Sequence, residues 1–306
     1  MRDSDEHAER FALLRPLLFT IAYEILGSAT ESDDVLQDSY LKWARVDLTT
    51  VRDTKSFLAQ LVTRKALDAL RAGARRREEY VGPWLPEPLL VSEDDASADI
   101  VLAESVSMGM LVLLETLDPE ERAVFVLHEV FGFAYPEISA AVGKSVAAVR
   151  QKAHRARGHV HARRNRFGPV DSARTAALTE QFLTAATTGD LDGLLAILAP
   201  DATWTTDSGG KVTAVRDLLI TGAAQVAATA MAVFGAAGRM PEVRIEPVNC
   251  NNQPAMAIYR EGDLEAVFLL EIADGRITDG YGIRNPDKLA ALSIARTLTR
   301  DNRHPR

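Results

Sequence analysis

The sequence predicts a multidomain protein in which two all-α regions are followed by an α+β domain. Apolar residues recur at three- and four-residue steps over residues 8–78 and again over 99–160, which is the spacing of amphipathic helices. After a loop at 165–169 the pattern changes to two helices and then to short strand-like runs separated by turn residues. With 306 residues, nearly half of them hydrophobic, the chain is long enough to bury several cores.

The first helical region contains three expected helices. The first carries its apolar residues over 11–26 and the second over 35–43. The third runs from near 55 to 71 and ends in the charge run at 75–79. Each is long enough to bury one apolar face against the others.

A proline-rich connector follows at Tyr80–Pro88, before an acidic stretch at 92–95. Three prolines within six residues exclude a helix, so we expect an extended segment. Trp84 and Leu85 are large apolar residues in this connector. We favour their packing on a neighbouring domain over a site for an outside partner.

The second helical region contains a predicted helix-turn-helix at residues 133–150. Pro136 suits the first turn of a short helix, and Gly143 suits its end. Ser145 is placed to cap the next helix. Two helices joined by a short turn that contains glycine form this motif.

The second helix of the motif has a small apolar face, formed by Val146, Val149, Ala153 and Ala156. The opposite face carries Ala147, Gln151, His154 and Arg155, flanked by Ala148 and Arg150. Eight Lys or Arg and no carboxylate lie between residues 144 and 166, although the whole chain has a net charge of -8. We favour DNA binding over a helical hairpin with a solvated basic face.

The last domain is expected to begin with helices at 171–187 and 190–198. Strands are expected at 202–206, 243–250, 255–259, 264–272 and 276–283, with helices at 216–234 and after Pro286. Residues 171–290 contain no histidine, and Asp207 is better explained by a turn or an interface than by acid–base catalysis. We therefore expect no enzymatic activity.

No cofactor and no metal are expected, because His154, His159 and His161 do not form a closed ligand set. The single cysteine, Cys250, excludes an internal disulfide and is expected to be a buried apolar side chain. The chain shows no secretory signal and no apolar run long enough to cross a membrane, so we expect a cytoplasmic protein.

The runs at 22–28 and 33–43 resemble the core-binding segment of extracytoplasmic-function (ECF) sigma factors. The resemblance implies a partner, the core RNA polymerase with its beta and beta-prime subunits, and polymerase contacts at five residues: Asp33, Asp34, Gln37, Asp38 and Leu41. Promoter DNA is the second implied partner, and promoter-specific initiation of transcription is the implied function.

The run at 56–71 resembles the segment of this family that melts and reads the −10 element, which implies DNA contacts at Arg64, Lys65, Asp68 and Arg71. Family members usually carry asparagine at the position of Lys65. The base-specific contact expected at this position is therefore where the sequence departs from the family pattern. The region from 114 through the helix-turn-helix resembles the domain that reads the −35 element. It implies contacts at Ser145, Ala147, Ala148, Arg150, Gln151, His154 and Arg155. Ala134 replaces the capping serine that is common there.

The connector and the run at 285–289 resemble signatures of the sigma J group, whose C-terminal domain is SnoaL-like. That resemblance implies an NTF2-type cone which regulates the sigma regions in cis, with contacts at Trp84, Leu85, Pro86, Asn285, Pro286, Asp287, Lys288 and Leu289. It implies a sigma-2 domain at 1–79, a linker at 80–104, a sigma-4 domain at 105–167, the SnoaL-like domain at 170–292 and a basic tail at 293–306.

Two alternatives remain open on the sequence. One is a helix-turn-helix regulator whose cone senses a small ligand and which acts without polymerase. The other is a cyclase-type enzyme fused to a DNA-binding module, since SnoaL-like folds include cyclases and isomerases.

Overall fold

The computed structural model describes residues 2–91, 99–164, 172–212 and 219–300. The chain divides into two compact units. Unit 1 comprises Met1–Glu78, Leu113–Ala162 and Thr297–Arg306, and unit 2 comprises Glu79–Val112 and Arg163–Arg296. The expected acidic stretch at 92–95, the loop at 165–169 and the tail from 301 lie outside the described residues.

Three long helices begin unit 1: α1 (Arg2–Leu26), α2 (Ala29–Trp43) and α3 (Thr54–Glu78), with a 3-10 turn at Leu48–Thr50. Trp43 is fully buried, and its indole N–H donates to the carbonyl of His7 at 2.9 Å. Helix α3 continues to Glu78 rather than ending near 71. Six of the seven added residues, all except Gly73, are good helix formers, and the Arg77 guanidinium donates to the carbonyl of Leu26 at 2.8 Å.

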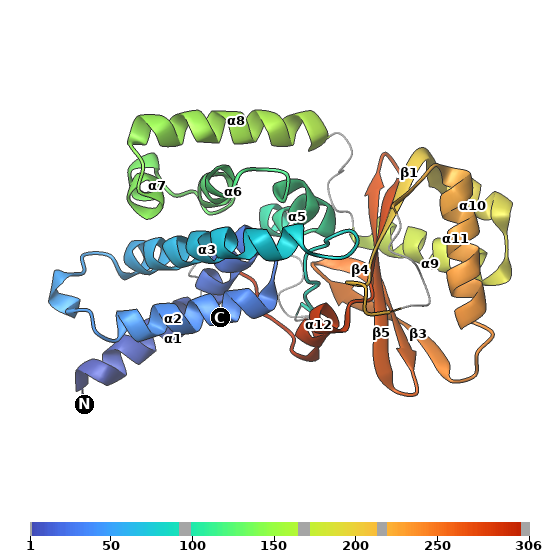
Figure 1. Cartoon of the computed structure of the whole chain (residues 1–306), viewed down its shortest axis with the longest axis horizontal. Helices are drawn as coiled ribbons and strands as arrows, with labels where there is room; N and C mark the ends of the chain where they lie inside the picture. The colour runs from blue at the N-terminus through green and yellow to red at the C-terminus, as the bar shows by residue number, and fades with distance from the viewer. Residues whose placement is uncertain (1, 92–98, 165–171, 213–218, 301–306) are drawn as a thin grey trace. The chain divides into compact units, whose positions relative to one another are not determined.

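The rest of unit 1 contains α6 (Pro119–Phe125), a π-helical segment (Val126–Val130), α7 (Tyr135–Val142) and α8 (Val146–Arg164). Figure 1 shows α8 lying across α6 and α7. Gly143 ends α7 in the left-handed conformation, at φ 69°, and the Ser145 hydroxyl caps α8 by accepting from the Ala148 N–H at 3.2 Å. The helix-turn-helix is therefore confirmed as a local structure.

Unit 2 is built on a six-stranded sheet in the order β2-β1-β6-β5-β4-β3, in which β1 and β6 are parallel and the other neighbours antiparallel. Its strands are β1 (Leu198–Asp207), β2 (Leu219–Thr221), β3 (Val243–Cys250), β4 (Gln253–Arg260), β5 (Asp263–Ala273) and β6 (Arg276–Ile283). Its helices are α4 (Ile100–Ser105), α5 (Met108–Leu114, whose last two residues belong to unit 1), α9 (Ser172–Thr188), α10 (Leu191–Ile197), α11 (Ala223–Ala237) and α12 (Pro286–Leu289).

The helix expected at 216–234 is wrong at its start. Edge strand β2 occupies 219–221, and α11 begins only at Ala223. Gly222 lies between them with φ 100°, a conformation that glycine adopts readily, and this turns the chain from the strand into the helix.

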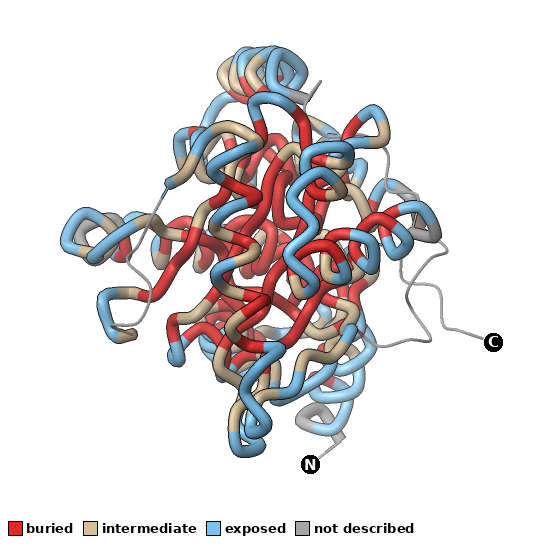
Figure 2. The backbone as a smooth tube through the Cα atoms, turned by 90° about the vertical axis from the view of Figure 1, so that its right-hand side faces the viewer, coloured by how far each residue is buried: buried red, intermediate tan, exposed pale blue. Residues whose placement is uncertain are grey.

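Both faces of the sheet are covered. On one face, α9, α10 and α11 pack over a cluster that contains the buried rings of Phe182, Trp204, Phe234 and Phe268, with centroids 5.0–6.3 Å apart. On the other face lie residues of the connector, α5 and α12, including Leu85, Met108 and Leu289. Figure 2 shows the buried stretches of backbone enclosed by exposed ones.

Candidate nucleic-acid and polymerase interfaces

Helix α8 has one buried and one exposed face. Val149, Ala153 and Ala156 are at most 2% exposed and form its packed side. Gln151 and His154 are exposed on the opposite side, together with Ala147. The small side chain of Ala147, the uncharged amide of Gln151 and the imidazole of His154 thus form a surface that can approach base edges.

The other predicted −35 residues lie at the edges of this surface. Ser145 uses its hydroxyl as the helix cap, and Ala148 is half-buried. The Arg150 guanidinium lies 5.6 Å from the centre of the Tyr135 ring, a cation–π distance. Arg155 is exposed, and its Nε lies 2.9 Å from a carboxylate oxygen of Glu121.

Several cations of the basic run are paired with carboxylates that precede it in the chain. Lys144 and Lys152 lie 3.4 and 3.3 Å from the carboxylate of Glu120. Arg157 is paired with Glu129 at 2.6 Å. Counting charges within residues 144–166 could not reveal these pairs, because all the carboxylates lie on α6 and the π-helical segment.

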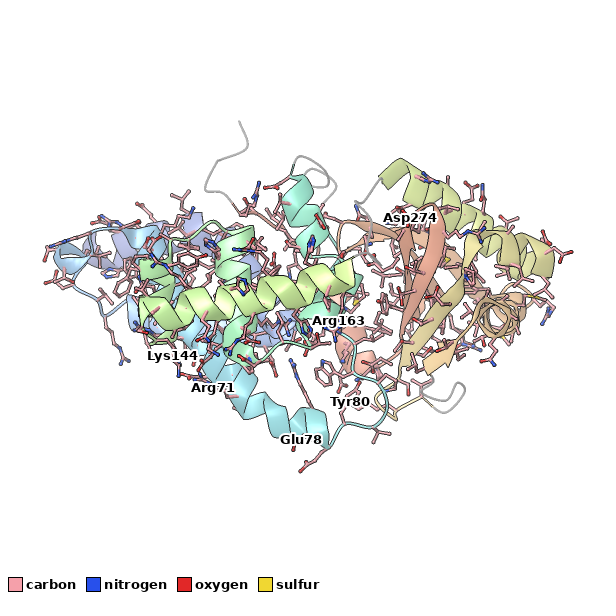
Figure 3. All side chains as sticks on the ribbon, turned by 90° about the horizontal axis from the view of Figure 1, so that it is seen from above. Arg71, Glu78, Tyr80, Lys144, Arg163 and Asp274 are labelled. Carbon is pink, nitrogen blue, oxygen red and sulfur yellow. The ribbon has the colours of Figure 1, made fainter. Side chains whose placement is uncertain are left out.

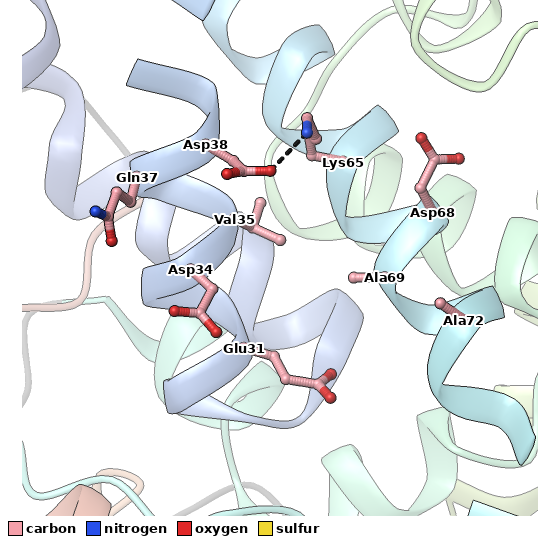
Figure 4. Close-up of a pocket in the computed structure, with 9 residues that line it drawn as sticks. All are labelled: Glu31, Asp34, Val35, Gln37, Asp38, Lys65, Asp68, Ala69 and Ala72. Atoms are coloured by element: carbon pink, nitrogen blue, oxygen red, sulfur yellow. Dashed lines mark hydrogen bonds and ion pairs between the residues drawn. The ribbon is translucent and has the colours of Figure 1, made fainter. Parts of the chain in front are cut away.

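Most of the predicted polymerase-binding residues share the solvent-facing side of α2. Asp34, Gln37 and Asp38 are exposed and line a pocket of about 650 Å³ between α2 and α3 (Figure 4). Asp33 is half-buried and pairs with Arg15 at 3.1 Å. Leu41 leaves 55% of its surface exposed and adds an apolar side chain to this side of α2.

The predicted −10 cations on α3 are all engaged by other residues of unit 1. Arg64 donates to the carbonyls of Ala140 and Ala141, at the end of α7, at 2.5 and 3.3 Å. Lys65 donates to Asp38 at 2.6 Å. That hydrogen bond and the charge of Lys65 hold the pKa of the Asp38 carboxyl below its ordinary value.

Arg71, the last of the three, pairs with Glu120 at 2.9 Å and lies 3.8 Å from Asp68. Asp68 itself is exposed and also lines the pocket between α2 and α3. The predicted −10 and polymerase-binding sets therefore meet at one pocket, and residues of the helix-turn-helix and of α6 hold two of the −10 cations.

A second polar cluster lies in unit 2, around the buried carboxylate of Asp207 at the end of β1. Asp207 accepts hydrogen bonds from the Tyr80 hydroxyl, from the Leu85 N–H at 2.9 Å and from the Lys288 ammonium at 2.7 Å. The same ammonium group donates to the carbonyl of Leu85 and lies 3.5 Å from the centre of the Trp84 ring. We call this cluster the connector latch.

The remaining regulatory candidates surround the connector latch. Asn285 caps α12 by accepting from the Asp287 N–H at 3.1 Å, and its amide donates to the Tyr80 hydroxyl at 2.8 Å. Pro286 occupies the first turn of α12, and Asp287 is exposed and pairs with Lys211. Pro86 and Leu289 are buried, Leu289 within the apolar cluster on this face of the sheet.

The sequence did not single out a third cluster, beneath the start of α5. The buried carboxylate of Glu271 accepts from the Gly109 N–H at 2.7 Å and from the Gln253 amide at 3.2 Å. The Met108 N–H donates to Gln253 at 3.2 Å. Burial raises the pKa of Glu271 to about 7, against the opposing effect of the two hydrogen bonds. Strand alternation alone would have placed an apolar residue there.

Cys250 is fully buried among apolar side chains of the same sheet face, as expected, and burial raises the pKa of its thiol to about 12. Within the described ranges, no group of three or more His, Cys, Asp or Glu residues is arranged to hold a metal ion. The helices described include none with the length and apolar character needed to cross a membrane.

Comparison with known proteins agrees with this arrangement. Residues 11–76 match the model of Sigma-70 region 2, residues 108–160 match Sigma-70 region 4, and residues 179–280 match the SnoaL-like domain. The ECF RNA polymerase sigma factor SigJ of Mycobacterium tuberculosis is 40% identical over 210 residues, which is 67% of each chain. The probable ECF sigma factor SigI of the same species is 29% identical over 280 residues, covering 91% of this chain and 93% of SigI. The crystal structure of M. tuberculosis SigJ matches with a TM-score of 0.73 at 29% identity, covering 93% of this chain and 98% of that one.

Two helical regions that match Sigma-70 regions 2 and 4, followed by a SnoaL-like domain, define a subunit that selects promoters for RNA polymerase. The chain belongs to the ECF sigma factors that carry a C-terminal SnoaL-like domain. As a sigma factor it binds core RNA polymerase and promoter DNA. This membership favours the sigma interpretation over a regulator that acts without polymerase, and the family points to a regulator rather than to an enzyme.

Proposed function

We propose that this sigma factor docks on the beta and beta-prime subunits of core polymerase with the solvent-facing side of α2. The exposed carboxylates of Asp34 and Asp38 lie near Leu41, which projects an apolar side chain into solvent. Apolar and polar groups side by side are what a protein interface requires. Catalysis of RNA synthesis belongs to the polymerase, so this chain contributes binding and positioning.

In the same proposal, α8 enters the major groove of the −35 element. The observation that carries this assignment is the exposure of Ala147, Gln151 and His154 on a helix whose opposite face is buried against unit 1. The α3 cations Arg64 and Arg71 would hold the opened −10 strand, as basic side chains do in other single-strand channels.

We further propose that the SnoaL-like domain regulates the sigma regions in cis through the connector latch. The latch fixes the connector that leaves region 2 to residues of the sheet domain, because Lys288 and Asp207 are almost fully buried and bonded to it. A tethered domain has an effective concentration of roughly millimolar against its own chain. Residues 171–290 carry 16 carboxylates and 9 Lys or Arg, which suits contact with basic surfaces.

The cone interior gives no support to catalysis. Four aromatic rings fill the face of the sheet that the helices cover, and the substitution Gly280→Ala would place a β-carbon 2.1 Å from Trp204. A general acid or base needs an open apolar pocket around it. The packing of the described residues on this face of the sheet therefore does not favour the cyclase-type alternative.

Run-off transcription with core polymerase on a random-insert template library tests the promoter assignment. We expect the chain to give transcripts whose upstream sequences share −35 and −10 elements, while polymerase alone gives none. The variant Gln151→Ala should change the −35 consensus, and the matched control Gln225→Ala, at an exposed residue of α11, should not. An unchanged −35 consensus in Gln151→Ala would remove α8 as the reading helix.

The regulatory assignment is tested with Lys288→Met in the full chain. Loss of the buried ammonium should change the transcript yield while binding to core polymerase stays the same. The control is Arg244→Met, which removes a cation from an exposed ion pair with Glu246 on β3. Equal yields from wild type and Lys288→Met would show that the connector latch has no regulatory role.

A further inference from the structure

Glu120, in the first turn of α6, contacts three cations that come from three different segments. Its carboxylate lies 2.9 Å from the Arg71 guanidinium on α3, 3.4 Å from the Lys144 ammonium in the turn before α8, and 3.3 Å from the Lys152 ammonium on α8. Figure 3 labels Arg71 and Lys144, which lie close together on the same side of unit 1. Only 16% of the Glu120 side chain is exposed.

The residues on either side of Glu120 extend the same pattern. Asp118 lies 3.4 Å from Lys152, and Glu121 lies 2.9 Å from Arg155. Partial burial pushes the pKa of Glu120 upward, but Lys152 and Lys144 outweigh it and hold the pKa below its ordinary value. Asp118, Glu120 and Glu121 therefore form a cluster of carboxylates that contacts cations of α3 and of the helix-turn-helix.

These cations are of the type that DNA requires. Lys and Arg contact the phosphate oxygens of nucleic acids, which are anionic hydrogen-bond acceptors just as a carboxylate oxygen is. A cation that is already paired with a carboxylate must leave it before it can contact a phosphate. Arg71 belongs to the segment proposed for the −10 strand, whereas Lys144 and Lys152 flank the helix proposed for the −35 element.

We propose that Glu120 is an intramolecular substitute for promoter phosphate, which holds Arg71, Lys144 and Lys152 until DNA takes its place. The inference rests on the proposed function, because these cations serve DNA only if α3 and α8 contact it. One carboxylate joins the two DNA-reading regions, so its release frees cations on both at once. The free chain then binds random DNA weakly. It binds tightly only to DNA sites that offer enough contacts to displace Glu120.

The substitution Glu120→Gln in the full chain tests this inference, with a fluorescently labelled duplex of random sequence as the probe. Anisotropy titrations over a range of salt concentrations measure the affinity. We expect roughly three- to tenfold tighter binding at low salt, because ion pairs that remain partly solvated hold their cations only weakly. The advantage over wild type should shrink as salt rises, because salt screens the internal pairs that hold the cations.

Two further variants make the result specific. Glu246→Gln removes the same charge from an exposed ion pair with Arg244 in unit 2 and should leave DNA affinity unchanged. Glu120→Asp keeps the charge on a shorter side chain and should give a smaller gain than Glu120→Gln. Thermal unfolding of each variant shows whether the fold is kept.

A Glu120→Gln chain that is folded and binds the duplex no more tightly than wild type would overturn the inference, and Glu120 would then be a structural ion-pair partner. An equal gain in Glu246→Gln would also overturn it, since overall charge would explain the effect. If neither wild type nor Glu120→Gln binds the duplex at low salt, the DNA-binding function itself fails, and the inference fails with it.

Discussion

We expect Glu271 to make the stability of unit 2 depend on pH. Its carboxylate is buried on the sheet face beneath the start of α5 and is held by the Gly109 N–H and the Gln253 amide. The cross-strand neighbour Asp279, on β6, is the charged group that faces it. Burial first, and then the charge of Asp279, raise the pKa of Glu271 to about 7, although both hydrogen bonds favour the ionised form.

The sign of the pH dependence follows from this raised pKa. The folded protein binds the Glu271 proton more tightly than the unfolded chain does, so protonation favours folding. The contribution is fully present below the ordinary pKa of 4.5 and is lost as pH rises through about 7. At about 1.4 kcal/mol for each pH unit of difference, the unfolding free energy should fall by about 3 kcal/mol across that window.

Urea unfolding of wild type and Glu271→Gln at several pH values between 5 and 8 isolates this contribution. Glutamine is nearly isosteric and can still accept from the Gly109 N–H, so the two proteins should be similarly stable at the acidic end. At the alkaline end the variant should be the more stable by up to about 3 kcal/mol. Asp263→Asn, at the exposed start of the same strand, is the control. Parallel stability curves for wild type and Glu271→Gln would refute the reasoning.

Three further predictions concern unit 2. Lys288→Met should cost about 3 kcal/mol of stability, because it leaves the buried Asp207 carboxylate without its cation; adding Asp207→Asn should recover part of this loss, and purely additive losses would contradict the pairing. Gly280→Ala should lower the free energy of unfolding by about 2 kcal/mol, because its β-carbon would lie 2.1 Å from Trp204; an unchanged urea midpoint and tryptophan spectrum would argue against this packing. Cys250 should resist maleimide at pH 8 in the folded protein and react in urea, since it is buried with a pKa of about 12; rapid labelling of the native chain would show the thiol to be accessible.

The sequence predicted the fold class and most elements because their signals are local. Strands at 243–250 and 276–283 have the predicted bounds, and the turn at Gly143 with the cap at Ser145 follows from short-range chemistry. Edge strand β2 was missed because it has only three residues, two of them exposed, and so short a segment carries almost no alternation of polar and apolar residues.

The partners of charged side chains were harder to predict, because they come from distant segments. Glu120 pairs with Arg71, which lies almost fifty residues earlier in the sequence. Asp207 accepts hydrogen bonds from Tyr80, near the start of the sequence of unit 2, and from Lys288, near its end. Composition could show that residues 144–166 are basic, but it could not show which of those charges are already paired. The same limitation left Glu271 unnoticed, since its donors lie on α5 and β4.

The linker between the two sigma regions belongs to unit 2, and we propose that the SnoaL-like domain acts on both regions through it. The first part of unit 1 ends at Glu78 and its second part begins at Leu113. Between them, Leu85 and Met108 are buried in the apolar cluster on one face of the sheet. Fully extended, that segment would reach on the order of 100 Å, whereas an anchored segment holds its two ends at a fixed separation. Reading two promoter elements at once requires a particular separation of α3 and α8. We therefore expect the contacts of Leu85 with Asp207 and of Met108 with Gln253 to affect promoter binding without touching DNA, because they limit how far the linker can extend.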